Sequence, residues 1–595
     1  MSDFRPPSSD MNFILEHVVG YRDVAALPGF EHADLETVSG LLDEAADFMS
    51  KVVAPTNRIG DKVGAQHDGK GNVTLPPEFK KAYGTYVESG WNTLQFPEQY
   101  GGGGFPSVVG LALQEMLQSS NMAFALCPLL TQGAIDALLH YGSDEQKNAY
   151  LPKMVSGEWT GTMNLTEPQA GSDVGALTTK AVPNGDGTYA ITGQKIYITW
   201  GEHDMAEQIV HLVLARTPGA PAGTRGISCF IVPKFILDED GNPGERNAVT
   251  ALSIEHKMGI HGSPTCVLNY EGATGYLIGE ENMGMRIMFV MMNVARLSVG
   301  MQGVALSERA FQQSLAYAKD RRQGLAIGAT GKDSAIIEFP DVRRMILTQK
   351  ASIAAIRRLM LLNASYMDIA SHHPDAAERT RATEIVGLLT PICKSFGTDL
   401  GNELTSIGLQ VHGGMGFIEE TGAAQYLRDS RILPIYEGTT AIQANDLVGR
   451  KTSRDGGRTP KAIATQIAVT EADLAKHESA AAKAMGKRLH AARIAFEQVV
   501  DYVAGNTKAS PNAVFAGSVP YLMLAGNVVA GWQMARALVR AEEMLSNGQG
   551  DAAFLKAKVT TAHFYADHLL SKVPGARDAI VDGADSVNAL ALESF

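Results

Sequence analysis

The sequence has little cysteine, and its four thiols show no pattern of a metal site or a disulfide framework. Cys127, Cys229, Cys266 and Cys393 lie far apart, without a CxxC pair and without histidine at ligand spacing. Scattered cysteines of this kind are typical of buried free thiols in a reducing compartment. The first residues also lack the positive stretch and apolar core of a secretory signal. These absences favour a cytoplasmic location in a bacterium and predict no bound metal.

Three further absences narrow the class of protein. Basic residues number 51 against 64 acidic ones, and a net charge of −13 argues against nucleic acid as a partner. No apolar run approaches about 18 residues, so no membrane span is expected. The glycines at 101–104 are not followed by Lys-Ser/Thr, and strands do not alternate with helices along the chain. A phosphate loop and a doubly wound nucleotide domain are therefore not expected.

What the sequence does have is enough chain for several domains and two kinds of hydrophobic period. Spacings of three and four indicate helices in most of the chain, whereas short β-branched runs separated by Gly and Asp/Asn turns indicate strands near the middle. We expect a mainly α protein with a middle antiparallel β domain, either a barrel or a sandwich. The expected parts are an N-terminal extension (1–34), a helical domain (35–158), the β domain (159–280), a helical bundle (281–451), a Gly-rich linker (451–460) and an additional C-terminal helical domain (461–595).

The bundle region shows a long mixed helix over 283–321 and further helices over 340–371, 375–407 and 440–450. A helix that is apolar on several sides is typical of an element buried between neighbours. Four such helices have the length of a four-helix bundle. Beyond the linker, Ala-rich periodicity predicts helices over 461–504, 511–547 and 551–573, without a recognisable catalytic group.

Two polar segments could line a binding site. Thr162–Val174 gathers hydroxyls, amides and turn residues where helix gives way to strand, as suits a loop along a polar ring system and a pyrophosphate. A well-capped connection explains the same composition equally well. In the strand Ile191–Gly201, Tyr197 and Thr199 share one face by the period of two. They could stack on a flat heterocycle and hydrogen-bond it, or could simply belong to a half-buried strand.

Glu437 is the candidate for acid–base chemistry. It follows the apolar pair Ile435-Tyr436 and precedes Thr439 or Thr440, either of which is a good N-cap for the next helix. The carboxylate is therefore expected on a loop end. For an isolated glutamate, a solvated loop position is the ordinary interpretation, because glutamate is seldom buried.

Six segments occur in the order found in acyl-CoA dehydrogenases, and the chain resembles that family over roughly 35–450. The segments are Leu165–Val174, Gly193–Gly201, Gly279–Met285, Asn293–Arg296, Gln410–Phe417 and Arg428–Thr439. The resemblance implies an N-terminal helical domain, a β-barrel domain and a four-helix bundle, with FAD as the cofactor. The implied reaction is α,β-dehydrogenation of an acyl-CoA thioester.

Carried over position by position, the resemblance implies roles for individual residues. Glu437 would be the base that removes the α-proton, strengthened by an apolar surrounding. Substrate would contact Ser172, Asn293, Arg296, Glu437 and Gly438. FAD would contact Met163, Leu165, Thr166, Gly171, Ser172, Tyr197, Ile198, Thr199, Arg321, Gln323, Gln410, Gly413, Gly414 and Thr439. Arg321, Gln323, Gln410, Gly413 and Gly414 are implied to reach the FAD of a neighbouring subunit, so a dimer or a dimer of dimers is expected.

Two features depart from the common family pattern. Gly324-Leu325 stands where the family commonly has Phe-Gly, which leaves the adenine contact open. The C-terminal extension resembles a long bacterial branch of the family, which implies a short thioether-bearing or a short-to-medium aliphatic acyl chain. An electron-transfer flavoprotein is the implied electron acceptor. An acyl-CoA oxidase and a DNA-binding relative remain alternatives, although the acidity of the chain and Glu437 itself count against the second.

Overall fold

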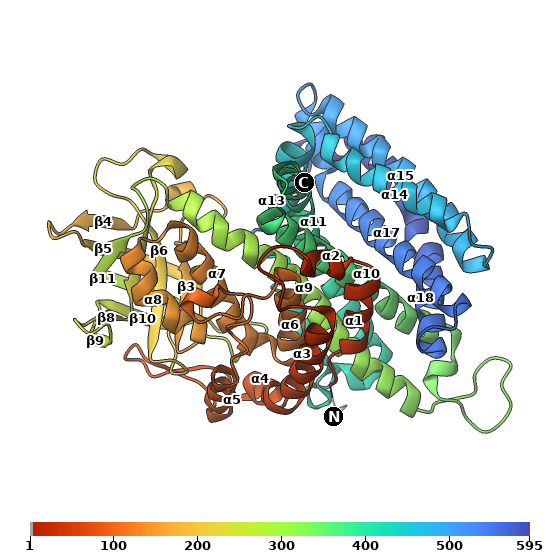
Figure 1. Cartoon of the computed structure of the whole chain (residues 1–595), viewed down its shortest axis with the longest axis horizontal. Coiled ribbons are helices and arrows are strands. Elements are labelled where there is room, and N and C mark those ends of the chain that lie inside the picture. The colour runs from red at the N-terminus through yellow and green to blue at the C-terminus, as the bar shows by residue number, and fades with distance from the viewer. Residues whose placement is uncertain (1–3) are drawn as a thin grey trace. The chain divides into compact units, whose positions relative to one another are not determined.

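The computed structural model describes residues 4–595, which form two compact units. The first unit comprises the chain up to Ala46, Pro106–Met116 and Val299–Phe595. The second comprises Asp47–Phe105 and Leu117–Ser298. Three of the four divisions fall within the helices α3 (Leu35–Phe48), α6 (Ser107–Ser120) and α9 (Gly284–Asp320), which Figure 1 labels, and the fourth lies just before α6. The division into five domains and a linker expected from the sequence stays a prediction.

The second unit contains a seven-stranded sheet in the order β3-β6-β7-β11-β5-β4, with β10 paired to β11. One pair, β3 with β6, is parallel, whereas all other pairs of this sheet are antiparallel. The sheet is therefore mainly antiparallel, as expected, and the one parallel pair is possible because β4 and β5 intervene in the chain and supply the long connection that parallel neighbours need. The strands are β3 (Trp159–Asn164), β4 (Lys180–Pro183), β5 (Tyr189–Thr199), β6 (Gln208–Ala215), β7 (Ser228–Pro233), β10 (Val249–Ile254) and β11 (Thr265–Leu277).

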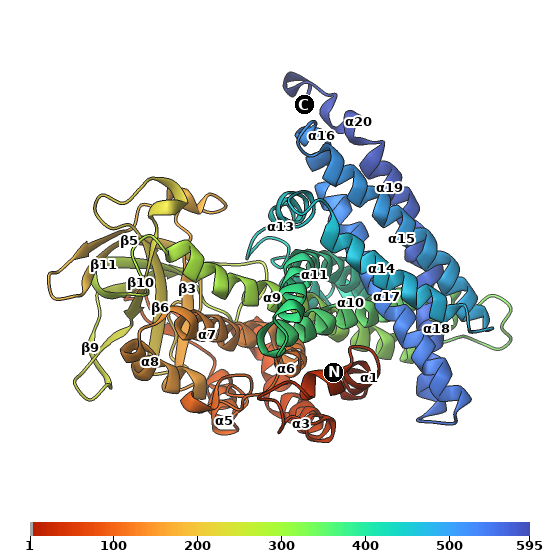
Figure 2. The same ribbon diagram turned by 45° about the horizontal axis from the view of Figure 1, so that its top comes forward.

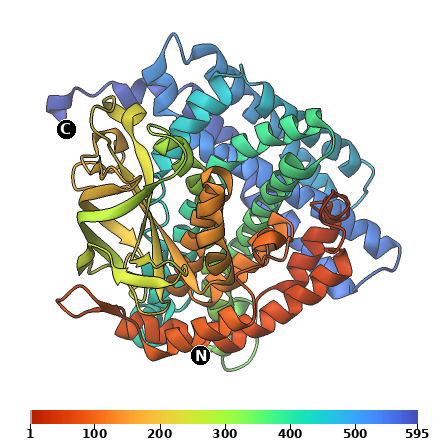
Figure 3. The same cartoon turned by 60° about the vertical axis from the view of Figure 1, so that its left-hand side comes forward.

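The sheet curls back on itself (Figure 3). The long strand β11 pairs along its length with β5, β10 and, at its end, β7, with two register shifts against β5 that bend it. Lys180 in β4 forms a parallel bridge to Arg216 just after β6. Every residue of β6 and β7 is buried, as expected for central strands covered on both faces. The result has the closed character of a barrel rather than two separate layers.

Helices and two small hairpins complete the second unit. α7 packs on β3, where Gly161 allows close approach, since a Cβ at that position would lie 2.6 Å from Cβ of Ala134. Asn121 caps α7, and Ser143 with Gln146 forms a capping box at α8. The elements are α4 (Asn57–Val63), α5 (Pro77–Glu88), α7 (Met122–Tyr141), α8 (Asp144–Ser156), and the pairs β1 (Gln66–His67) with β2 (Val73–Thr74) and β8 (Phe235–Leu237) with β9 (Pro243–Arg246).

The first unit is helical throughout. Its centre is the helical hairpin α10–α11, against which the end of α9 packs through small residues: a Cβ on Gly303 would lie 2.1 Å from the carbonyl oxygen of Gly397. Two glycine backbones therefore let α9 and α11 approach each other closely. The elements before the C-terminal extension are α1 (Ser8–His17), α2 (Tyr21–Ala25), α10 (Pro340–His372), α11 (Ala376–Val411), α12 (Ala423–Ser430) and α13 (Thr440–Asp446).

The C-terminal extension lies in the same unit, and its α17 and α18 pack on α10 (Figure 2). The continuous helix expected over 461–504 is two helices, because Ser479 caps a new start. The expected linker 451–460 is mostly helical, with a π-helix at Leu447–Ser453 and α14 beginning at Arg458. The helices are α14 (Arg458–Leu474), α15 (Ala480–Asn506), α16 (Pro511–Ala516), α17 (Ser518–Ser546), α18 (Ala552–His568), α19 (Val573–Val581) and α20 (Ala584–Asn588).

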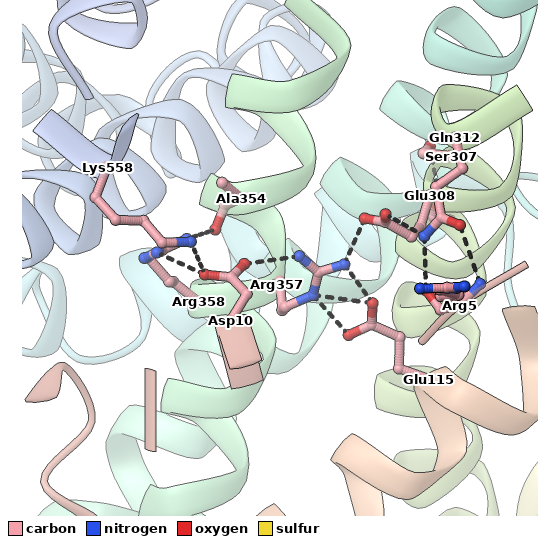
Figure 4. A network of polar contacts seen from close by, with 11 residues as sticks. Arg5, Asp10, Glu115, Ser307, Glu308, Gln312, Ala354, Arg357, Arg358 and Lys558 are labelled. Atoms are coloured by element: carbon pink, nitrogen blue, oxygen red, sulfur yellow. Dashed lines mark hydrogen bonds and ion pairs between the residues drawn. The ribbon is translucent and has the colours of Figure 1, made fainter. Parts of the chain in front are cut away.

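A buried ionic network joins distant parts of the first unit (Figure 4). The guanidinium of Arg357 on α10 donates to Glu115 on α6, Glu308 on α9 and Asp10 on α1. Asp10 also accepts from Lys558 on α18. Burial alone would raise the pKa of Asp10, but Lys558, Arg358 and Arg357 outweigh it and hold that pKa well below its usual range. Asp10 on the N-terminal helix α1 is thus bonded both to the two arginines of α10 and to Lys558 of the C-terminal extension.

In the described part of the chain, three helices are long and apolar enough to cross a membrane, by length and composition. They are α7, α9 and α17, and 89%, 67% and 78% of their most apolar windows are buried inside the protein. The prediction of no membrane span rested on the lack of long uninterrupted apolar runs, and these three helices contain occasional polar residues. Much of their apolar surface is used in packing against other elements of the protein.

Candidate active site

Glu437 lies on the loop between α12 and α13 in the first unit. Its backbone is left-handed, with φ 55°, which is rare for a residue with a side chain and is found at sites where the surroundings hold strain. Thr439 caps α13 through the amide of Ile442, as the sequence predicts. The side chain of Glu437 is half-buried, and that of Ile435 beside it is 49% exposed.

Three side chains hold this loop from neighbouring helices. Lys394 on α11 donates to the carbonyl oxygens of Leu433 at 2.9 Å and Gly438 at 2.8 Å. Thr440 donates to Asp399, also on α11, at 2.7 Å. The hydroxyl of Tyr436 donates to Gln302 on α9. Burial raises the pKa of Tyr436, and the charge of Glu437 raises it further, so the phenol stays neutral and a hydrogen-bond donor.

The second unit brings three of the predicted flavin residues together. The amide of Ile196 donates to the carbonyl oxygen of Thr166 at 2.9 Å, so the loop after β3 lies along the end of β5. Tyr197 has φ 59° at a register shift of β5 and is 61% exposed, whereas Ile198 is buried in the core. The hydroxyls of Thr166 and Thr199 form no hydrogen bond within residues 4–595.

An ion pair beneath this surface fixes the loop. The ammonium of Lys195 donates to Glu167 at 2.8 Å and to the carbonyl oxygen of Leu165 at 3.0 Å, and both charged side chains are almost completely buried. Glu167 also accepts from the amides and hydroxyls of Thr178 and Thr179. Burial acts to raise the pKa of Glu167, but Lys195 and these donors lower it to about 2. Thr166, between the two bonded residues, is thereby held in place.

The remaining predicted residues of the second unit are placed individually. Leu165 is buried, Met163 is half-buried, and Gly171 and Ser172 are exposed on the loop that follows. On α9, Arg296 donates to Asn293 at 3.3 Å, one helical turn earlier. The structure therefore makes these last two residues neighbours on one face of α9.

The residues predicted to reach a neighbouring subunit lie on two exposed stretches of the first unit. Arg321 donates to Gln323 at 3.3 Å after the end of α9. Gln410, Gly413 and Gly414 are exposed at the end of α11, and a Cβ at either glycine would meet nothing within 4 Å. Both stretches also carry exposed apolar side chains, namely Leu325, Ile327, Met415, Phe417 and Ile418.

Sequence reasoning missed the buried residues that support the Glu437 loop in the first unit and the Thr166 loop in the second. Lys394 and Lys195 are fully buried, and Gln302 lies far from Tyr436 in the chain. No local pattern marks a buried lysine, because its partners are carbonyl groups or side chains from other segments. No group of three or more His, Cys, Asp or Glu within residues 4–595 is arranged to hold a metal ion.

The donor set fits a flavin. A flat ring system needs an exposed aromatic face and hydroxyl or amide groups for its polar edge. In the second unit Tyr197 is exposed, Thr199 lies two residues further along the chain, and Thr166 is bonded through its carbonyl oxygen to Ile196. In the first unit the Nε2 atom of His412, next to Gly413, is buried and has no hydrogen-bond partner among residues 4–595. Such an atom is ready to bond a polar ligand at the glycine turn.

Comparison with protein families matches nearly the whole chain. The acyl-CoA dehydrogenase N-terminal, middle and C-terminal domains match residues 36–158, 162–273 and 282–451, and an acetyl-CoA dehydrogenase C-terminal-like domain matches 462–591. The chain belongs to the acyl-CoA dehydrogenase family, whose members are FAD-dependent oxidoreductases.

Individual relatives span the whole chain as well. The chain is 49% identical to a 3-methylmercaptopropionyl-CoA dehydrogenase of Ruegeria pomeroyi, over 98% of this chain and 99% of that protein. It is 37% identical to a butyryl-CoA dehydrogenase of Syntrophomonas wolfei, over 92% and 91%. The solved structure of a Bacillus anthracis acyl-CoA dehydrogenase complexed with FAD has a TM-score of 0.74 at 22% identity, covering 98% and 92%, and supports the fold.

Proposed function

We propose that this acyl-CoA dehydrogenase oxidises 3-methylmercaptopropionyl-CoA to 3-(methylthio)acryloyl-CoA, with Glu437 as the base that removes the α-proton. The observation that carries the proposal is the left-handed, triply braced loop that presents one half-buried carboxylate. Strain of this kind is kept where a side chain must be aimed. The 49% identity with a dehydrogenase of that name over nearly the whole chain supports the choice of substrate.

Removal of the α-proton is the step that the protein must assist. An α-C–H is a very weak acid, so the base must be held within reach of it and partly shielded from water. Glu437 follows Ile435 and Tyr436, and the neutral phenol of Tyr436 keeps its hydrogen bond to Gln302 and so helps to hold the loop. Bound FAD would accept the hydride from the β-carbon. Asn293, Arg296, Ser172 and Gly438 are proposed to hold the thioester and the CoA portion.

A substitution at Glu437 tests the base. Glu437→Gln keeps the volume of the side chain and removes its basicity, and we expect the rate of flavin reduction by substrate to fall by at least about 10²–10⁴-fold. The matched control is Glu478→Gln, a charge removal at a side chain that is 89% exposed. Anaerobic stopped-flow mixing measures the rate, and the flavin spectrum reports retained FAD. Near wild-type reduction in the Glu437→Gln enzyme would refute the assignment.

A short-to-medium aliphatic acyl-CoA is the second candidate substrate, because the chain is also 37% identical to a butyryl-CoA dehydrogenase. The two candidates differ by the thioether sulfur and not by the reaction. We expect kcat/KM for 3-methylmercaptopropionyl-CoA to exceed the values for butyryl-, hexanoyl- and octanoyl-CoA. A strong preference for octanoyl-CoA would overturn the methylthio assignment.

The proposal includes a homo-oligomer, an electron-transfer flavoprotein as acceptor and a cytoplasmic location. The exposed apolar side chains Leu325, Ile327, Met415, Phe417 and Ile418 support subunit contacts, since large exposed apolar groups mark interaction surfaces. Light scattering gives the subunit number. Peroxide release in place of dye reduction would identify an oxidase, and a gel shift at low salt would identify a DNA-binding relative.

A further inference from the structure

Lys394 is a buried lysine whose hydrogen bonds reach the loop of Glu437. It lies in the middle of α11, and its side chain is fully excluded from solvent. The ammonium donates at 2.9 Å to the carbonyl oxygen of Leu433 and at 2.8 Å to that of Gly438. These two carbonyls stand four residues before Glu437 and one residue after it. One side chain therefore joins both ends of the short arch that presents the carboxylate.

A buried ammonium is costly, so its position requires explanation. Removing a charge from water costs several kilocalories per mole unless hydrogen bonds or opposite charges compensate it. Asp399, about one and a half turns further along α11, is bonded to Thr440 and lies near enough for the charge of Lys394 to lower its pKa against the effect of burial. The protein thus places the charge where it binds the loop backbone.

The arch needs such support because its backbone is strained. Glu437 and Gly438 both have positive φ, 55° and 88°, and a glutamate does not adopt this conformation at low cost. Gln443 adds one bond, from its side-chain amide to the carbonyl oxygen of Glu437 at 3.3 Å. That bond is long, so the two shorter bonds of Lys394 are the stronger restraint on the peptide groups that flank the carboxylate.

We propose that Lys394 is a positioning residue for Glu437: it fixes the backbone of the 433–438 arch, so that the carboxylate keeps the position and orientation needed for proton removal. The inference rests on the proposed role of Glu437. It predicts that loss of the ammonium slows the chemical step and leaves substrate binding almost unchanged, because no part of Lys394 is exposed to a ligand.

The test compares Lys394→Met with Lys394→Gln. Methionine fills a similar volume without a donor, whereas glutamine keeps a shorter donor that can bond one carbonyl. We expect kcat of the methionine variant to fall roughly 10–100-fold with KM within about threefold, because misplacement of a catalytic group by about 1 Å costs on the order of 10²-fold. The glutamine variant should fall between the methionine variant and the wild type. The isotope effect of α-deuterated substrate should rise, because proton removal becomes slower.

A matched control separates positioning from general stability. Gln349→Met removes a buried donor that bonds the carbonyl oxygen of Leu404 and an acceptor for Ser314, elsewhere in the same unit. It should lower Tm as the Lys394 variant does, with kcat retained. Hydrogen exchange of the peptide 433–443 should accelerate in the Lys394→Met enzyme only.

The outcomes distinguish this inference from the proposed function. If Glu437→Gln is inactive and Lys394→Met keeps wild-type kcat and loop exchange, the positioning role is refuted and the base stands. If Glu437→Gln remains active, the proposed base is wrong and the positioning role falls with it. Equal losses of kcat in Lys394→Met and Gln349→Met would show a structural role and also overturn the inference.

Discussion

Arg357 is expected to be the most costly charged residue to remove from the first unit. Its guanidinium makes three bonds to Glu115 of 2.6–2.9 Å, one of 2.8 Å to Glu308 and one of 2.9 Å to Asp10 (Figure 4). The side chains of Arg357 and Glu115 are 3% and 0% exposed. Removal of one member of a buried pair leaves an uncompensated charge in a medium that solvates it poorly.

The size of the stability loss in Arg357→Met follows from the hydrogen bonds and ion pairs that each carboxylate retains. In Arg357→Met, Asp10 retains Lys558 and Arg358, and Glu308 retains Gln312. Glu115 loses all of its bonds to the guanidinium, so most of the cost falls on this one group. Breaking a buried pair costs about 3–5 kcal/mol. At roughly 2 °C per kcal/mol for a large domain, the apparent Tm should fall by about 6–10 °C.

Scanning fluorimetry at one fixed heating rate measures this shift, because a chain of this size is apt to unfold irreversibly. The control is Arg344→Met, which breaks the exposed pair with Asp341 and should cost no more than about 1 kcal/mol. The double variant Arg357→Met with Glu115→Leu should recover part of the loss, since apolar groups replace both charges. Equal Tm shifts in the two single variants would refute the reasoning.

Two other expectations concern helix packing and pH. Gly303→Ala should destabilise the first unit by about 1–3 kcal/mol or more, because the added Cβ would lie 2.1 Å from the carbonyl oxygen of Gly397 and overpack the helix contact. The control is Gly505→Ala, where an added Cβ meets no atom within 4 Å. Chemical denaturation measures the free energy of unfolding of both variants. In the second unit, burial and then Lys234 lower the pKa of His203 and of His211 to about 3. Because the unfolded histidines take up protons near pH 6.5 and the folded ones do not, stability should fall as pH drops from about 6.5 towards 3, by up to about 1.4 kcal/mol per pH unit for each histidine. His211→Asn should flatten that dependence, and an unchanged slope would contradict the assignment.

Much of the fold could be predicted from local sequence. The long helix expected over 283–321 is α9, and those expected over 340–371 and 375–407 are α10 and α11, each within a few residues of the expected ends. Helices like these are predicted by the spacing of apolar residues and by Pro or Gly at their ends. Both signals involve residues only a few positions apart, so they can be read from the sequence alone. The parallel pairing of β3 with β6 could not be predicted in this way, because residues 165–207 separate the two strands.

The features of the candidate site also divide into those that neighbouring residues predict and those that depend on distant partners. The loop position of Glu437 and the cap at Thr439 followed from neighbouring residues, whereas the expected catalytic role came from resemblance over six ordered segments. Sequence spacing did not indicate Lys394, whose partners lie 39 and 44 residues away, or Arg357, whose partners lie 49, 242 and 347 residues away. Nor did it indicate the left-handed backbone at Glu437.

The sequence by itself therefore determined the order of helices and strands, the family and the loop that carries the carboxylate. Only the tertiary structure decided which buried charges hold that loop and join α1 to α18. The physical reason is that periodicity and capping depend on near neighbours, whereas the cost of a buried charge depends on whichever distant groups the fold brings within 3 Å or so of it.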